Sequence, residues 1–250
     1  MPQPKKFGAF AGVFTPSILS ILGVIMYLRL GWVVGEAGLI NALAIIVIAH
    51  LISITTGLSI SSIATDKKVK AGGIYYMLSR SLGLPMGGAI GILRYLSTSL
   101  SIGLFLIGFA ENFLALDFIR EFFHLGTTIN DIRIVGTAAI IVLVVIAYIS
   151  TSLAIKSQFV VFAAIALSLV AIVAGLFVNT EFKPVEVSLL PVENGMSFES
   201  IFAIFFPAVS GFTVGVAMSG DLKDPKKDIP RGSLMAILVG FVVYLSLAIL

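Results

Sequence analysis

The sequence of 250 residues has no cysteine and only two histidines, His50 and His124. Without cysteine there is no disulfide framework and no thiolate site for a metal or a redox reaction. Neither histidine has a plausible ligand set around it, and the motifs of zinc proteases, serine hydrolases and nucleotide-binding loops are absent. These absences favour a protein that is not an enzyme, and we expect no cofactor, no transition metal and no nucleic-acid partner.

Charge is also scarce in this chain. Only 12% of the residues are charged, about half the share expected of a soluble domain, whereas 58% are hydrophobic. A helix needs about 20 apolar residues to cross roughly 30 Å of hydrocarbon. The sequence offers seven such stretches, and it therefore predicts an all-α, polytopic integral membrane protein in a lipid bilayer. The stretches are approximately Ala11–Val34, Ile40–Ile63, Met86–Phe113, Ile132–Ile149, Ile155–Val178, Phe198–Met218 and Ser233–Leu250.

The distribution of lysine and arginine between the loops predicts the orientation of the chain. With the N-terminus in the cytoplasm, eleven of these residues lie inside and three outside, which follows the positive-inside rule. We therefore expect a cytoplasmic N-terminus over residues 1–10 and a transmembrane domain over residues 11–250, in the cell membrane. The last apolar stretch ends without a polar tail, so this domain is expected to be incomplete. The inner set is Lys5, Lys6, Lys67, Lys68, Lys70, Arg80, Lys156, Lys223, Lys226, Lys227 and Arg231, and the outer set is Arg120, Arg133 and Lys183.

The first apolar stretch has proline, serine and glycine near its middle. Pro16 removes one helical donor, and Gly23 lowers the cost of leaving helical dihedral angles. A break around Ser20 to Gly23 would expose carbonyls, which suit a cation, and amides at the positive end of the next half-helix, which suit an anion. A continuous helix with a kink at Pro16 explains this stretch equally well.

The sixth apolar stretch also contains proline, serine and glycine, and here they lie within five residues. Because Pro207, Ser210 and Gly211 are so close, an uninterrupted helix would need several compensations within one turn, and a break around Val209 to Gly211 is favoured. In hydrocarbon a helix can open only where protein shelters it and a ligand or cavity faces it. Two such breaks are typical of the substrate and ion site of a secondary transporter.

Four further sequence motifs are GVIMYLRLGWVVGEAG at 23–38, TGLSISSIAT at 56–65, GGIYYMLSRSLG at 72–83 and MSGDLKDP at 218–225. All four resemble motifs of the cation-chloride cotransporters. The last of them, with the KKDIPR that follows it, also resembles the loop of amino-acid permeases, in the wider amino acid-polyamine-organocation superfamily. The resemblance runs from about Gly12 to Leu238. It implies a LeuT-like core of ten helices in two inverted repeats of five, with helices one and six unwound at the midplane; this chain would hold the first repeat and helices six and seven.

The resemblance implies cation ligands at both breaks. A potassium site would use Ser20 and Ile21 of helix one with Pro207 and Ser210 of helix six, and Ser20 replaces the usual asparagine of the family. Phe105 stands where the family has a tyrosine ligand on helix three. Phenylalanine offers no oxygen, which weakens selective potassium binding. A sodium site would use carbonyls of Leu19 and Leu22 with hydroxyls of helix eight, so sodium dependence stays open.

The resemblance also implies two chloride sites and an outer gate. One chloride site consists of the amides of Gly23, Val24 and Ile25, and the other of the amides of Gly211, Phe212 and Thr213. Backbone amides tolerate changes of side chain. Arg29 and Glu111 match a gate pair between helices one and three, although Arg29 could instead reach the outer headgroups.

Three function classes follow from these observations. The first is a secondary active transporter that moves chloride with potassium or sodium by alternating access, with a homodimer expected for the full-length protein. The second is an amino-acid or organic-cation permease of the same superfamily, whose substrate carboxylate would bind the same amides. Such permeases have several glycines in close succession in helix one, whereas only Gly23 lies at this break, which favours ions. The third is a non-transporting, truncated fragment.

Overall fold

The computed structural model describes residues 6–66, 71–149, 151–178, 188–193 and 195–250. It forms two compact units, one of residues 1–87 with 158–250 and one of residues 88–157. Part of the predicted charge pattern lies outside the described residues, namely Lys5, Lys67, Lys68, Lys70 and Lys183.

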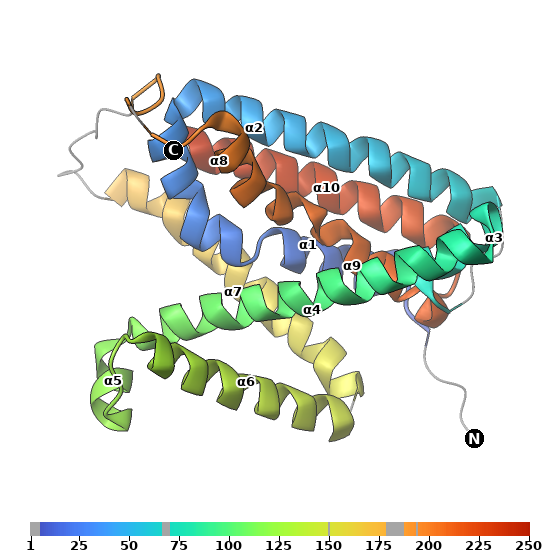
Figure 1. Cartoon of the computed structure of the whole chain (residues 1–250), viewed down its shortest axis with the longest axis horizontal. Coiled ribbons are helices and arrows are strands. Elements are labelled where there is room, and N and C mark those ends of the chain that lie inside the picture. Colours follow the sequence, from blue (N-terminus) through green and yellow to red (C-terminus); the bar gives the residue numbers. More distant parts are fainter. Residues whose placement is uncertain (1–5, 67–70, 150, 179–187, 194) are drawn as a thin grey trace. The chain divides into compact units, whose positions relative to one another are not determined.

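Six helices in the described chain are long and apolar enough to cross a membrane. The first runs over Phe10–Asp66, and its 57 residues at about 1.5 Å per residue would span the hydrocarbon more than twice. It contains two crossings, because the chain reverses direction at Gly38, within α2 (Val24–Asp66), where φ is 71° and ψ is 156° (Figure 1). The all-α, polytopic membrane fold predicted from the sequence is confirmed.

The first unit contains the elements of helices one, two, six and seven. Helix one consists of a π-helical turn (Phe10–Phe14), α1 (Thr15–Ile21) and the first part of α2. Helix six consists of α8 (Phe198–Phe205), a 3₁₀ segment (Phe206–Phe212) and α9 (Thr213–Ala217). A further 3₁₀ turn (Ser219–Asp221) leads to α10 (Pro225–Ile249), and α3 (Gly73–Leu82) packs against α9.

The second unit contains most of α4 (Leu84–Leu114), then α5 (Asp117–Phe123) and α6 (Ile129–Ile149). The next helix, α7 (Thr151–Val178), belongs to the first unit from Gln158 onward. There the ring of Phe162 lies edge-on to Phe14, with centroids 6.3 Å apart.

The predicted start of the seventh span at Ser233 is wrong, since α10 begins eight residues earlier, at Pro225. Proline suits the first position of a helix, where its missing N–H would have no partner. Asp228 lies in the first turn, and its carboxylate accepts the amide of Asp224 at 2.9 Å. The stretch of alternating charges and prolines before Ser233 is therefore the first part of α10, with a hydrogen bond from the Asp224 amide to the Asp228 carboxylate at its start.

Close packing holds the core of the first unit together. Lipid tails are as apolar as leucine, so small residues that let backbones approach matter more here than exclusion of water. A Cβ on Gly57 of α2 would lie 2.9 Å from Ile237, and a Cβ on Gly240 of α10 would lie 2.6 Å from Ile21. These glycines let α10 pack against both α2 and α1.

Backbone hydrogen bonds fasten the two ends of this unit. At one end the Phe7 amide donates to Asp221, and the Lys223 amide donates to Phe7, both at 2.8 Å. At the other end the Met196 amide donates to the carboxylate of Glu36 at 2.9 Å, beside the reversal at Gly38. The start of helix one is thereby tied to the segment that follows helix six.

Candidate functional site

Helix one is interrupted between α1 and α2. Ile21 is the last residue of α1, Leu22 leaves the helical region with φ −85° and ψ 34°, and α2 begins at Val24. The interruption therefore lies at Leu22 and Gly23, the end of the predicted range, while Ser20 is still helical. A continuous helix with a kink at Pro16, the alternative left open by the sequence, is not what the structure has.

The interruption leaves backbone groups without helical partners. The amide of Leu22 still donates to Ile18 at 2.8 Å, and the amide of Met26 donates to Gly23 at 3.1 Å. Between them, the amides of residues 23 to 25 donate to no backbone carbonyl in the described ranges. Three adjacent donors at the positive end of a long helix form a geometry suited to an anion.

Carbonyl oxygens gather on the other side of the same turn. A Cβ on Gly23 would lie 3.2 Å from the carbonyl oxygen of Ser20 and 3.3 Å from that of Leu19. Neither oxygen accepts a backbone amide from any residue that the structure describes. Glycine at this position therefore leaves room beside two oxygens of the kind that alkali cations bind.

Helix six is not open at its predicted break around Val209 to Gly211, where the chain forms a 3₁₀ helix. The segment Phe206–Phe212 keeps a helical course in the tighter 3₁₀ form. Pro207 has no N–H to donate, and its carbonyl accepts the hydroxyl of Ser210 at 2.8 Å. The Thr213 amide donates to the carbonyls of Ser210 and Gly211, so this predicted chloride donor is already hydrogen-bonded.

The altered segments of helices one and six pack against each other. A Cβ on Gly211 would lie 2.6 Å from the hydroxyl oxygen of Ser20 and 2.8 Å from its carbonyl carbon. The structure thus brings together Ser20, predicted for the cation, and Gly211, predicted for chloride. Pro207 and Ser210, in contrast, are exposed in the structure.

Three buried hydroxyl groups that sequence reasoning missed bind carbonyls at the two segments. Ser17 of α1 donates to Phe212 at 2.9 Å and accepts the amide of Gly215 at 3.3 Å. Ser53 of α2 donates to Val209 at 3.0 Å. A hydroxyl in an apolar stretch needs a partner, which is the signal that could have singled these serines out.

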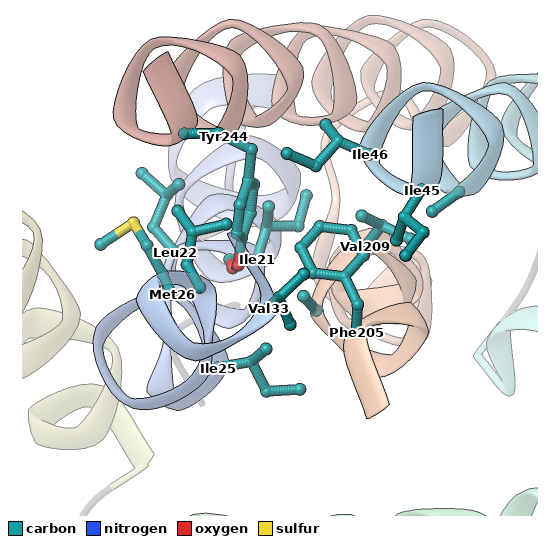
Figure 2. Close-up of a cluster of buried hydrophobic side chains, with 14 of the residues drawn as sticks. Ile21, Leu22, Ile25, Met26, Val33, Ile45, Ile46, Phe205, Val209 and Tyr244 are labelled. Carbon is teal, nitrogen blue, oxygen red and sulfur yellow. The ribbon is translucent and has the colours of Figure 1, made fainter. Parts of the chain in front are cut away.

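The third hydroxyl belongs to Tyr244 of α10. Figure 2 shows its side chain pointing from α10 toward α1, with the oxygen at Ile21, and it donates to the Ile21 carbonyl at 2.8 Å. Ile21 is the last residue of α1, so this hydroxyl binds a carbonyl at the interruption. A predicted cation ligand is therefore already a hydrogen-bond acceptor, while the side chain of Leu22 is buried in the apolar core.

The remaining predicted residues are the two gate residues and Phe105. Arg29 is exposed on α2 in the first unit, and Glu111 is exposed on α4 in the second. Their pairing as an outer gate stays a prediction. Within the second unit, the ring of Phe105 lines an apolar cavity of about 690 Å³ together with residues of α6 such as Val135 and Ala138.

Comparison with known proteins identifies the family. Residues 12–250 match the model of the family described as Amino acid permease. The chain belongs to this family. The amino acid permease family is consistent with the LeuT-like fold expected from the sequence.

Curated relatives place the chain more narrowly. It is 38% identical to Solute carrier family 12 member 2 of Mus musculus, over 98% of the chain and 21% of that protein. It is 36% identical to Solute carrier family 12 member 1 of Homo sapiens, over 98% and 23%. It is 39% identical to the Bumetanide-sensitive sodium-(potassium)-chloride cotransporter of Manduca sexta, over 96% and 24%. The resemblance to cation-chloride cotransporters is confirmed, and the chain spans between a fifth and a quarter of the length of these relatives.

Proposed function

We propose that this chain belongs to a secondary active transporter of the cation-chloride cotransporter type. It would move chloride with an alkali cation by alternating access around helices one and six. The interruption of helix one at Leu22 and Gly23 supports this proposal, because amides and carbonyls at one turn have no backbone partner among the described residues. The names of the relatives, one of which is a sodium-(potassium)-chloride cotransporter, point in the same direction.

In this proposal the cation binds where α1 ends. The carbonyls of Leu19 and Ser20 would be its main-chain ligands, with those of Ile21 and Leu22 at the edge of the site. Pro207 and Ser210 of helix six would complete it. Because Phe105 supplies no oxygen, we expect potassium selectivity to be weak.

Chloride would bind the amides on the α2 side of the turn. Gly23, Val24 and Ile25 would form the first site, and they are the stronger candidate because their amides lack backbone partners within the part of the chain that the structure describes. Gly211, Phe212 and Thr213 would form the second. Since the Thr213 amide is hydrogen-bonded, this second site would need a local rearrangement of the 3₁₀ segment.

The larger arrangement is proposed from the sequence. Residues 1–10 would be cytoplasmic, residues 11–250 would form the incomplete transporter domain, and the protein would act in the cell membrane, as a homodimer when complete. Arg29 and Glu111 would close the outer side. Exchange of ions between the two sides would then follow from rocking of helices one and six against the remaining helices.

An uptake assay tests the proposal. The complete open reading frame that contains residues 1–250 is expressed in cells, and uptake of ³⁶Cl, ⁸⁶Rb and a panel of labelled amino acids is measured. We expect chloride uptake that depends on rubidium or sodium. Chloride uptake that is indifferent to both cations would contradict the proposal.

A proline substitution tests the chloride site. Val24 is the first residue of α2, where proline is tolerated, so Val24→Pro removes one amide donor without breaking the helix. Hydrogen bonds to a charged group contribute about 1.5–3 kcal/mol, so we expect the KM for chloride to rise by at least about tenfold. Val24→Ala keeps the amide and serves as the matched control; equal KM values in the two variants would remove the amides of α2 from the site.

An amino-acid permease is the second candidate, because the matching family is described by that activity. A substrate carboxylate would bind the same three amides. Uptake of a labelled amino acid without chloride dependence would favour this candidate. Expression of residues 1–250 alone tests the remaining alternative, since a fragment without uptake beside an active complete protein would be a non-transporting piece.

A further inference from the structure

One face of α10 contacts the end of α1 at two positions, Gly240 and Tyr244. Gly240 and Tyr244 are four residues apart, so they lie on the same face of the helix. A Cβ on Gly240 would lie 2.6 Å from the side chain of Ile21, and the hydroxyl of Tyr244 donates to the carbonyl of Ile21 at 2.8 Å. One residue of α1, directly before the interruption, is thus fixed by both its side chain and its backbone.

The tyrosine ring is itself fixed. Tyr244 is fully buried, and its ring lies edge-on to Phe205 of α8 at 5.3 Å (Figure 2). The ring of His50 lies 5.8 Å away. A buried tyrosine hydroxyl needs a partner. The backbone carbonyl of Ile21 is this partner, at 2.8 Å.

The hydrogen bond from Tyr244 engages only one of the carbonyls at the end of α1. An α-helix ends with four carbonyls that lack amide partners. In α1 the carbonyl of Ile18 keeps its amide and that of Ile21 accepts Tyr244, whereas those of Leu19 and Ser20 accept no backbone amide in the described chain. The hydroxyl therefore anchors the last carbonyl of α1 and leaves the two before it beside Gly23.

We propose that Tyr244 is a positioning residue for the cation site, acting through the backbone of Ile21. The hydroxyl fixes the direction of the final turn of α1, and with it the positions of the carbonyl oxygens of Leu19 and Ser20. This inference rests on the proposed function, since it assigns a cation to those oxygens. It predicts that loss of one hydroxyl on helix seven changes cation affinity more than chloride affinity.

The test is Tyr244→Phe in the complete open reading frame, with initial rates of ³⁶Cl uptake measured against the concentration of sodium, potassium and chloride in turn. Hydrogen bonds between membrane helices contribute about 0.6–1.7 kcal/mol, which corresponds to a KM for the cation about three- to eighteenfold higher. The KM for chloride is expected to change less than about twofold. The differences in KM among lithium, sodium, potassium and rubidium should become smaller.

Tyr27→Phe is the matched control. It also removes one tyrosine hydroxyl from the first unit, but that hydroxyl is exposed and donates to Ser168 of α7 at 3.1 Å, not to a carbonyl of α1. A purely structural role of Tyr244 would lower expression, melting temperature and kcat for every ion alike. A KM for the cation equal to that of Tyr27→Phe would overturn the inference, while absence of coupled uptake in the unsubstituted protein would overturn the proposed function instead.

Gly240→Ala provides a second test should Tyr244→Phe not yield folded protein. Its new methyl group presses on Ile21 from the same helix and keeps the hydroxyl. We expect the same direction of change, a raised KM for the cation with a smaller change for chloride. Gly31→Ala, where a Cβ would have nothing within 4 Å, is its control. Equal cation KM values in these two variants would count against positioning through Ile21.

Discussion

Helices one and six both contain proline followed by serine and glycine, yet only helix one is interrupted there. Helix one stops at Ile21 and restarts at Val24, which leaves three amides with no backbone partner among the residues that the structure describes. Helix six continues through Phe206–Phe212 as a 3₁₀ helix and keeps its Thr213 amide bonded. The difference shows that proline and glycine set where a helix departs from the α form, while neighbours decide whether it opens.

The neighbours of the two segments explain this difference. The carbonyls of Val209 and Phe212 in helix six bind Ser53 and Ser17, from two other elements of the unit. Helix one has one such bond at its end, from Tyr244 to Ile21. Because hydroxyls from outside fix helix six at two points, its turns are held in a closed form, and we infer that the amides of helix one are the primary anion site.

The largest effect should come from the closest approach of the two helices. A Cβ on Gly215 would overlap the carbonyl of Val13 and lie 2.6 Å from the hydroxyl of Ser17. Backbone cannot move aside cheaply, so we expect Gly215→Ala to destabilise the protein by about 3 kcal/mol. The melting temperature of the purified protein, compared with that of Gly31→Ala, measures this. Equal melting temperatures would show that helices one and six are further apart than described.

The next effect tests the bonds that close helix six. Ser17→Ala leaves the carbonyl of Phe212 and the amide of Gly215 without this partner, and we expect a loss of about 1–2 kcal/mol. Ser59→Ala, which removes an exposed hydroxyl bonded within its own helix, should cost less than about 0.5 kcal/mol. Denaturation curves in detergent give both values. Identical curves would show that the hydrogen bonds of Ser17 do not stabilise helix six.

Ser53→Ala should have a smaller effect, because it breaks one bond, to Val209. We expect about 0.6 kcal/mol, the average for hydrogen bonds between membrane helices. The informative readout is the amide exchange rate at residues 209–213. If Ser53 holds helix six closed, exchange there should accelerate while that at residues 23–25 is unchanged; acceleration at both would mean that the two helices open together.

Phe105→Tyr should leave the stability of the protein nearly unchanged and tests whether position 105 belongs to the cation site. The ring lines an apolar cavity and is 43% exposed, so a hydroxyl can be accommodated. We expect potassium dependence of uptake to rise about threefold if main-chain oxygens alone form a weak potassium site. An unchanged response to potassium would remove position 105 from the cation site.

The sequence predicted the fold well and the site in part. Apolar length located the spanning helices, since hydrocarbon thickness dictates it. The start of α10 was wrong because Pro225 and Asp228 are signals for both a loop and a helix start. Ser17, Ser53 and Tyr244 were missed because each acts on a carbonyl distant in sequence, and only folding brings donor and acceptor together.

The most direct test of the account is an anomalous difference map from crystals of the complete protein grown in sodium bromide. We expect α1 to end at Ile21 and bromide to lie within hydrogen-bond distance of the amides of Gly23, Val24 and Ile25. A helix wound without interruption through Leu22 and Gly23, or a map without bromide at these amides, would contradict it.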